Sequence, residues 1–361
     1  ALVVRRELLG DVSAEVAATL FDIADVLTRQ GKYKEAEGPI RESLQTRRTL
    51  YGSNHAEIAE SVEALGLNLF DQGNLDGAVV ELRNAVATFR ELHGQRHPEL
   101  AAALGNLAFV LAEVGEVNEA ESLYREALGM QRELHAEAHP EVASALNNLG
   151  SILSERGDNA AAEAAYAEAL QIMRELLGDE HPNIAVAQFN IANVRYNRGD
   201  TAGAIELMRQ TLYQRRRTLG ADHPDVADSA LNLALWLTGE GDYAEAEPLL
   251  EEGITIRTAA YGEDHPRVAV GRVAMADLLI ATGRYEEALA LAQRSRSSLE
   301  GTLPDDHWLV AYASSALGAA LAGLGSYAEA ENLLLSSREP LTMAPIPGAQ
   351  EANRMRLASL Y

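Results

Sequence analysis

A period of 42 residues runs through the chain and limits what it can fold into. Histidines stand at this interval from His55 to His307, and Ser13 occupies the position where an earlier one is expected. Glycines keep the same interval from Gly31 to Gly325, and alanines from Ala36 to Ala330. Self-similarity at a fixed period of this length indicates a repeat architecture, in which each unit packs on its neighbours.

Each unit contains two stretches whose apolar residues recur at helical spacing. One unit shows both stripes: Ala143, Leu146, Gly150 and Leu153, then Ala162, Tyr166, Ala169, Met173 and Leu176. Hydrophobic residues make up 47% of the chain and aromatic residues only 5%, which suits closely packed helices better than a β-sandwich or barrel. The sequence therefore predicts an all-α fold of helix pairs.

The recurring histidine and proline predict where each first helix begins. Pro140 lacks an N–H, which costs nothing at a first helical position, and His139 before it is suited to the N-cap. Gly157 supplies the positive φ that ends the same helix. The alternative is a metal or acid/base role for the histidines, but equivalent ones are separated by a whole helix pair, and zinc ligands must meet at about 2 Å. We therefore predict no metal site.

Small residues recur where the two helices of a unit must approach each other. We expect each of them to face the alanine of the partner helix, since larger side chains would force the pair apart. These positions are Gly66, Ala108, Gly150, Ala192, Ala234, Ala276 and Gly318.

The order of residues in one unit resembles a known repeat. Leu149, Gly150, Leu153, Gly157, Ala162, Tyr166 and Ala169 follow the tetratricopeptide repeat pattern, and the 42-residue period with its His-Pro turn is similar to the type found in kinesin light chains. The resemblance covers residues 11–346 and implies a right-handed α-α superhelix, or solenoid, of eight repeats. Residues 1–10 are expected to end a truncated preceding helix, and residues 347–361 to form a C-terminal helix, also truncated, of a longer polypeptide.

Charge and composition restrict the partners. The formal charge, 30 − 54 = −24, is spread along the chain, which disfavours nucleic acid and anionic membrane. There is no cysteine, so a reducing compartment is expected, and no apolar run is long enough to span a bilayer. We expect a cytoplasmic protein whose partners are proteins or peptides with a basic and apolar extended segment.

Arginines form a second ladder, at Arg48, Arg90, Arg132, Arg174 and Arg216. One interpretation is a site for a phosphorylated partner. The simpler one, which we favour, is that each cation near the end of a second helix complements the helix dipole and the preceding acidic turn.

Asparagines recur in the middle of first helices, where they are poor helix formers. They are Asn106, Asn148, Asn190 and Asn232. In the kinesin-light-chain-like arrays this position faces the concave groove and hydrogen-bonds the backbone of an extended peptide, so the resemblance implies the same here. The alternative is an intramolecular bond that holds one repeat to the next.

The resemblance also places other residues on the groove. They are Phe21, Phe70, Phe109, Phe189, Asn193, Tyr196 and Leu235, and Glu60, Glu63, Asp71, Glu113 and Glu155 make the N-terminal half acidic. Aromatic residues that packing does not require indicate a binding surface. The alternative is that the superhelix closes enough to bury them.

Three hypotheses about function follow. The first is a non-catalytic scaffold that binds an extended peptide in its groove. The second is a regulatory region of a larger bacterial signalling enzyme, such as a serine/threonine kinase. The third, an enzyme, is disfavoured because the chain has no phosphate-binding glycine loop, nucleophile elbow or kinase signature, and we predict no catalytic residue and no cofactor.

The repeat prediction has a direct test. Deletion of one period in register, residues 56–97, should leave a shorter folded solenoid, because contacts are made between neighbours. Far-ultraviolet circular dichroism should show the helical signal per residue retained. Complete loss of that signal would count against the repeat architecture.

Overall fold

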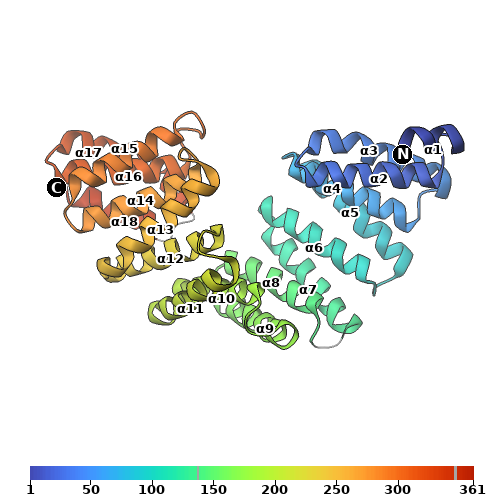
Figure 1. Cartoon of the computed structure of the whole chain (residues 1–361), viewed down its shortest axis with the longest axis horizontal. Helices are drawn as coiled ribbons and strands as arrows, with labels where there is room; N and C mark the ends of the chain where they lie inside the picture. Colours follow the sequence, from blue (N-terminus) through green and yellow to red (C-terminus); the bar gives the residue numbers. More distant parts are fainter. Residues whose placement is uncertain (136–137, 345–347) are drawn as a thin grey trace. The chain divides into compact units, whose positions relative to one another are not determined.

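The computed structural model describes residues 1–135, 138–344 and 348–361. These residues form eighteen α-helices and one 3-10 helix and contain no β-strand, which confirms the predicted all-α class. The chain divides into two compact units, Ala1–Gly178 and Asp179–Tyr361, and each is described by itself (Figure 1).

The first unit is a stack of helix pairs. Helix α2 packs on α3, α4 on α5, α6 on α7 and α8 on α9, and each second helix also packs on the first helix of the next pair. The short helix α1 lies against α2. The bounds are α1 Leu2–Leu9, α2 Ala14–Arg29, α3 Tyr33–Tyr51, α4 Ala56–Asp71, α5 Leu75–His93, α6 Pro98–Glu113, α7 Val117–Leu134, α8 Pro140–Glu155 and α9 Asn159–Leu177.

The second unit repeats this arrangement. The pairs are α10 with α11, α12 with α13, α14 with α15 and α16 with α17, and the chain then places the 3-10 helix η1 and helix α18 against α16. The stacking of pairs in each unit is the solenoid arrangement predicted from the period. The bounds are α10 Pro182–Asn197, α11 Thr201–Leu219, α12 Pro224–Glu240, α13 Tyr243–Tyr261, α14 Pro266–Ala281, α15 Tyr285–Leu299, α16 Trp308–Gly323, α17 Tyr327–Ser336, η1 Pro340–Met343 and α18 Ala349–Ala358.

The first helices begin and end as predicted. Nδ1 of His139 accepts a hydrogen bond from the Glu141 N–H at 3.2 Å, with the His139 backbone extended, and Pro140 follows as the first helical residue. Gly157, after the same helix, has a φ of 79°. The same cap bond forms at His55, His97, His181, His223, His265 and His307. The periodic histidines are therefore helix caps.

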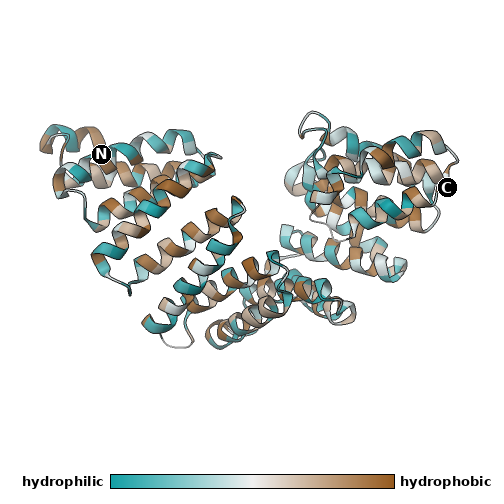
Figure 2. Cartoon of the chain, turned by 180° about the vertical axis from the view of Figure 1, so that it is seen from behind, coloured by the Kyte–Doolittle hydropathy of each residue, from teal (hydrophilic) through white to brown (hydrophobic). Residues whose placement is uncertain are grey.

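The paired helices approach closely at Gly66, Gly150 and Gly318. Gly318 faces Ala330 as predicted, with Leu334 beside it, but at the other two glycines the facing residue differs from the prediction. A Cβ added to Gly150 would lie 2.7 Å from the Tyr166 ring, and one added to Gly66 would lie 2.7 Å from Leu82 Cγ. These large side chains stand one helical turn after the alanine that was expected to face the glycine. Figure 2 shows hydrophobic and hydrophilic residues alternating along the helices, as this one-sided burial requires.

The arginine ladder connects second helices of consecutive repeats. Arg90 pairs with Glu126 at 2.7 Å and Arg132 with Glu168 at 2.5 Å, each partner lying 36 residues later in the chain. Arg216 pairs in the same way with Glu252. These three arginines therefore pair with a glutamate of the next repeat and not with the preceding acidic turn, which was the expected partner. Their position near the ends of second helices agrees with the expected stabilisation by the helix dipole. Exposed pairs of this kind contribute at most about 1 kcal/mol each.

The close approach at Gly150 yields a matched pair of variants. Gly150→Ala should lower the free energy of unfolding by about 1–3 kcal/mol, because the methyl group has no room beside Tyr166. Gly129→Ala, inside α7 with nothing within 4 Å of an added Cβ, should raise it by about 0.5–1 kcal/mol. Urea denaturation followed by circular dichroism measures both. Equal effects would show that the helix pair does not depend on this contact.

Candidate functional site

A pocket opens on the first helices of the first unit. It has a volume of about 260 Å³ and lies between α6 and α8, with α7 at its back. Asn106, Phe109 and Asn148 line it, so the structure brings together three of the residues predicted for the groove. Gly105 makes room for it, since Phe21 and Phe189 stand at the equivalent positions of other repeats and nothing lies within 4 Å of a Cβ added to Gly105.

Phe109 is the most exposed of the predicted aromatic residues. Its exposed fraction is 44%, and its ring packs edge-on against Phe70 with the ring centroids 5.2 Å apart. Phe70 is half-buried. An aromatic ring this exposed, beside a pocket with polar amides, is typical of a surface that binds a partner.

The two asparagines of the first pocket differ in their partners. Asn106 Nδ2 donates to Glu63 Oε1 at 2.9 Å, which joins the first helices of adjacent repeats. This is the intramolecular bond that the sequence left open as an alternative. The Asn148 amide has no hydrogen-bond partner among the described residues, and it lines the pocket.

The acidic residues near this pocket are partly desolvated. Burial raises the pKa of Glu60, of Glu63 and of Asp71 above their ordinary values. Arg47 opposes the shift at Glu60, and the Asn106 hydrogen bond opposes it at Glu63. Glu113 and Glu155, at the ends of α6 and α8, are exposed. The first unit therefore presents a band of carboxylates along the same face as the pocket.

A larger pocket, of about 560 Å³, lies in the second unit. Phe189, Asn193, Tyr196, Asn232 and Leu235 line it, so all but one of the predicted groove residues of this unit meet there. The remaining one, Asn190, is half-buried on α10 and is absent from the lining. Helices α14, α16 and α18 contribute the other side. This pocket and the one in the first unit are separate sites.

The polar side chains of the second pocket are bonded to each other. Asn232 Nδ2 donates to Asn193 Oδ1 at 3.3 Å, and Asn193 Nδ2 donates to the Phe189 carbonyl at 2.9 Å. The first of these bonds joins α10 to α12, again the intramolecular arrangement. Tyr196 stacks on Trp236 with the ring centroids 4.7 Å apart.

Two of the buried arginines lie over aromatic rings, and the sequence analysis did not identify them. The Arg47 guanidinium lies 4.7 Å from the Phe21 ring centroid and donates to Ser61 Oγ at 2.8 Å. Four repeats later, Arg215 lies 4.5 Å from the Phe189 ring centroid and donates to Ser229 Oγ at 2.9 Å. Phe21 and Phe189 are half-buried, and an arginine covers one face of each ring. The sequence contained a signal for this arrangement, because the Phe, Arg and Ser of the first site each recur 168 residues later in the second.

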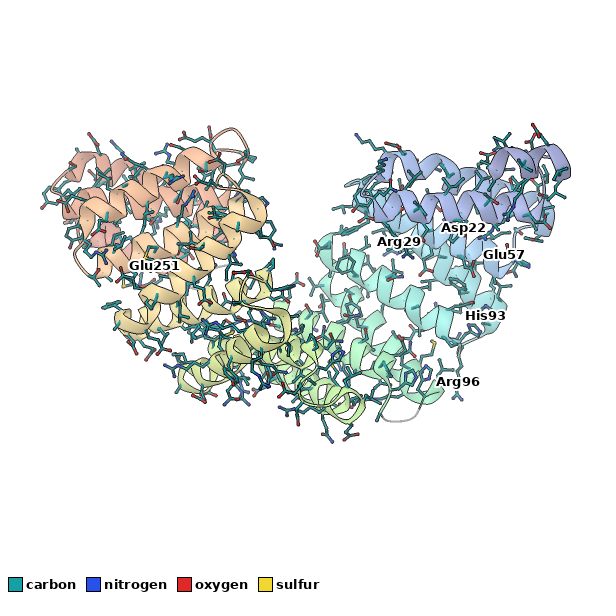
Figure 3. All side chains as sticks on the ribbon, in the orientation of Figure 1. Asp22, Arg29, Glu57, His93, Arg96 and Glu251 are labelled. Carbon is teal, nitrogen blue, oxygen red and sulfur yellow. The ribbon has the colours of Figure 1, made fainter. Side chains whose placement is uncertain are left out.

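One group of side chains has the composition of a metal site. Atoms of His93, His97 and Glu99 lie within 4.8 Å of one another, where α5 ends and α6 begins. Figure 3 labels His93 at this place. The two imidazole rings are stacked at 3.7 Å with an angle of 11°, and Nδ1 of His97 already accepts the Glu99 N–H. The nitrogen lone pairs lie in the planes of the rings, and two nearly parallel planes 3.7 Å apart do not direct them at one ion. The arrangement fits a cap with a stacked ring, as at His135 and His139.

Comparison with known proteins identifies the family. The family model described as tetratricopeptide repeat matches residues 15–79, 57–133, 141–212, 184–259 and 230–301, which is more than half of the chain. The chain is a tetratricopeptide repeat protein. This fold is typical of protein–protein interaction scaffolds, and such repeat proteins are generally not catalytic.

Solved structures show the same fold. A putative kinesin light chain from Podosopora anserina is 25% identical, with a TM-score of 0.51 over 57% of this chain and 98% of that one. BtubC (BKLC) from P. vanneervenii is 23% identical, with a TM-score of 0.55 over 64% of this chain and 92% of that one. The Rap protein complexed with Competence and Sporulation Factor is 15% identical, with a TM-score of 0.57 over 96% and 98%.

A search of curated protein sequences found no match. Among the residues that the structure describes, no helix is both long enough and apolar enough to cross a membrane.

The half-buried carboxylate of Glu63 predicts a pH dependence. Because its pKa is raised in the folded chain, the stability that it contributes is present at low pH and is lost as the pH rises through that pKa. Glu63→Gln keeps an acceptor for Asn106 and removes the charge, so it should raise the free energy of unfolding at pH 7 by up to about 1 kcal/mol. The gain should shrink as the pH is lowered in thermal melts.

The control is Glu113→Gln, which changes an exposed carboxylate on α6 and should leave the melting temperature unchanged at both pH values. A loss of stability in Glu63→Gln at pH 7 would show that the charged form is the one that the fold favours.

Proposed function

We propose that this tetratricopeptide repeat protein is a non-catalytic scaffold that binds an extended peptide segment along its first helices. The observation that carries the proposal is the first pocket, where Gly105 leaves space, Phe109 is exposed and the Asn148 amide lines the space with no hydrogen-bond partner in residues 1–135, 138–344 and 348–361. A carboxamide both donates and accepts, so it suits the backbone of an extended chain. Its neighbour Phe109 supplies apolar contact area.

The chemistry of the partner follows from the surrounding charge. Glu60, Asp71 and Glu113 stand on the same face of α4 and α6, and the chain as a whole carries a formal charge of −24. A basic segment with apolar residues at intervals complements this face, and its affinity should weaken as salt rises.

The complex named for the Rap structure, with Competence and Sporulation Factor, supports a binding role for an array of this fold. The absence of cysteine agrees with a cytoplasmic location, which is part of the proposal.

Selection of peptides on the whole chain tests the proposal. A library of random decapeptides should yield sequences enriched in Lys or Arg together with apolar residues, and calorimetric titration should show weaker binding at higher salt. Gly105→Phe, which installs the residue found at two equivalent positions, should fill the pocket and abolish binding. Asn148→Ala should weaken binding up to about tenfold, because one hydrogen bond contributes about 0.5–1.5 kcal/mol.

Gly129→Ala is the matched control, because Gly129 lies on α7 outside the pocket lining. It should bind the selected peptides as the unaltered chain does. Unchanged affinity in Gly105→Phe, with a normal melting temperature, would place binding elsewhere, and enrichment of acidic peptides would refute the charge argument.

A further inference from the structure

Helix α18 lies against the first helices of the last two repeats (Figure 1). Its Arg356 donates to Asp277 Oδ1 on α14 at 2.5 Å and to Ser315 Oγ on α16 at 2.9 Å. Asn353, one turn earlier, is buried and donates to the Leu334 carbonyl of α17 at 3.0 Å. These bonds fix α18 to three other helices of the unit.

Asp277 is held by a second donor. The Tyr312 hydroxyl donates to Asp277 Oδ2 at 2.9 Å, and Tyr312 is 3% exposed. Burial, together with the nearby Asp277 charge, raises the pKa of Tyr312 well above its ordinary value, so the hydroxyl keeps its proton near neutral pH. Both oxygens of the carboxylate are thus engaged, one of them by a cation with a 16% exposed side chain.

The placement of α18 changes the character of the second pocket. Gly348, Ala349 and Ala352 line it opposite Phe189 and Leu235, so α18 is one of its walls. Asp277 is the only charged residue among the described lining residues, and Arg356 neutralises it. The pocket therefore has no net charge, in contrast to the carboxylate band of the first unit.

The remaining lining is apolar or aromatic, with amides at one edge. Leu235 and Val270 supply aliphatic surface, and the stacked Tyr196 and Trp236 supply a flat aromatic one. Asn193 and Asn197 supply amides at that edge. The volume of about 560 Å³ exceeds what a single aromatic side chain requires and leaves room for part of the backbone that carries it.

We propose that the second pocket, with α18 as its wall, binds an uncharged aromatic side chain of the peptide partner. Arg356 acts as a positioning residue, because it holds α18 in place and cancels the charge of Asp277. The inference rests on the proposed peptide-binding function and adds a second, neutral contact to it. A basic side chain is excluded from this pocket, since no free carboxylate among the described lining residues remains to pair with it.

The probe is N-acetyl-4-fluorophenylalaninamide, whose fluorine signal is followed by NMR as the whole chain is added. The fluorine signal should broaden and shift with the probe at millimolar concentration, and N-acetylphenylalaninamide should compete with the probe. N-acetyllysinamide should compete poorly. Absence of any change, or better competition by the lysine amide, would overturn the proposal.

Two tryptophan variants of α18 locate the site. Ala352→Trp places a large side chain in the pocket and should abolish probe binding. Ala358→Trp makes the same change at an exposed position of the same helix, outside the lining, and should bind as the unaltered chain does. Equal effects of the two substitutions would contradict a pocket walled by α18.

The Arg356→Ala variant tests whether α18 forms a wall of the second pocket or blocks that pocket. If α18 is a wall, releasing it should weaken the fluorinated probe about tenfold, because one apolar side of the pocket is lost, and should strengthen N-acetyllysinamide through the freed Asp277. If α18 instead blocks the pocket, the same variant should bind the fluorinated probe more tightly, which would overturn the proposal. Circular dichroism should confirm that the repeats stay folded.

The outcome is distinguishable from that of the proposed function. Peptides that lose affinity in Gly105→Phe but not in Ala352→Trp would leave the peptide-binding function intact and refute only the neutral pocket. Peptides that bind both variants as tightly as the unaltered chain would refute both the proposed function and the neutral pocket.

Discussion

Close contact between the two helices of each repeat is the constraint on which the rest of the structure depends. At Gly66 and Gly150 the first helix carries no side chain, and Leu82 and Tyr166 of the second helix fill the space. Because the position recurs every 42 residues, each repeat presents the same apolar edges to the next, and the units stack. The histidine caps and the positive-φ glycines set the length of each first helix and so keep the contact in register.

Packing at that contact leaves the opposite face of the first helices free to vary. In the first unit this face has Gly105 and the exposed Phe109 beside a band of carboxylates. In the second unit, Phe189 stands at the position of Gly105 two repeats later and Asp277 at that of Phe109 four repeats later, and each is covered by an arginine, Arg215 or Arg356. The same backbone position therefore gives a polar, acidic surface in one unit and a neutral, apolar pocket in the other.

The sequence was sufficient to predict the helix pairs, the caps and eight of the residues that line the two pockets, because these depend on period and local chemistry. It did not predict which side chains pair across repeats. Asn106 reaches Glu63, 43 residues earlier, and Arg356 reaches Asp277, 79 residues earlier. Such pairs depend on side-chain conformation and on the packing of α18, neither of which has a periodic signal. For the same reason, Asn106 and Asn232 proved to hold adjacent repeats together, while Asn148 lines the first pocket and has no partner in the part of the chain that the structure describes.

The central claim is that this array binds through its first helices. Backbone amide chemical-shift mapping of the whole chain with one selected peptide tests it most directly. We predict that the largest changes fall on α6 and α8 around Gly105 and Asn148. Changes centred on the second helices, along the ladder of Arg90 and Glu126, would contradict it.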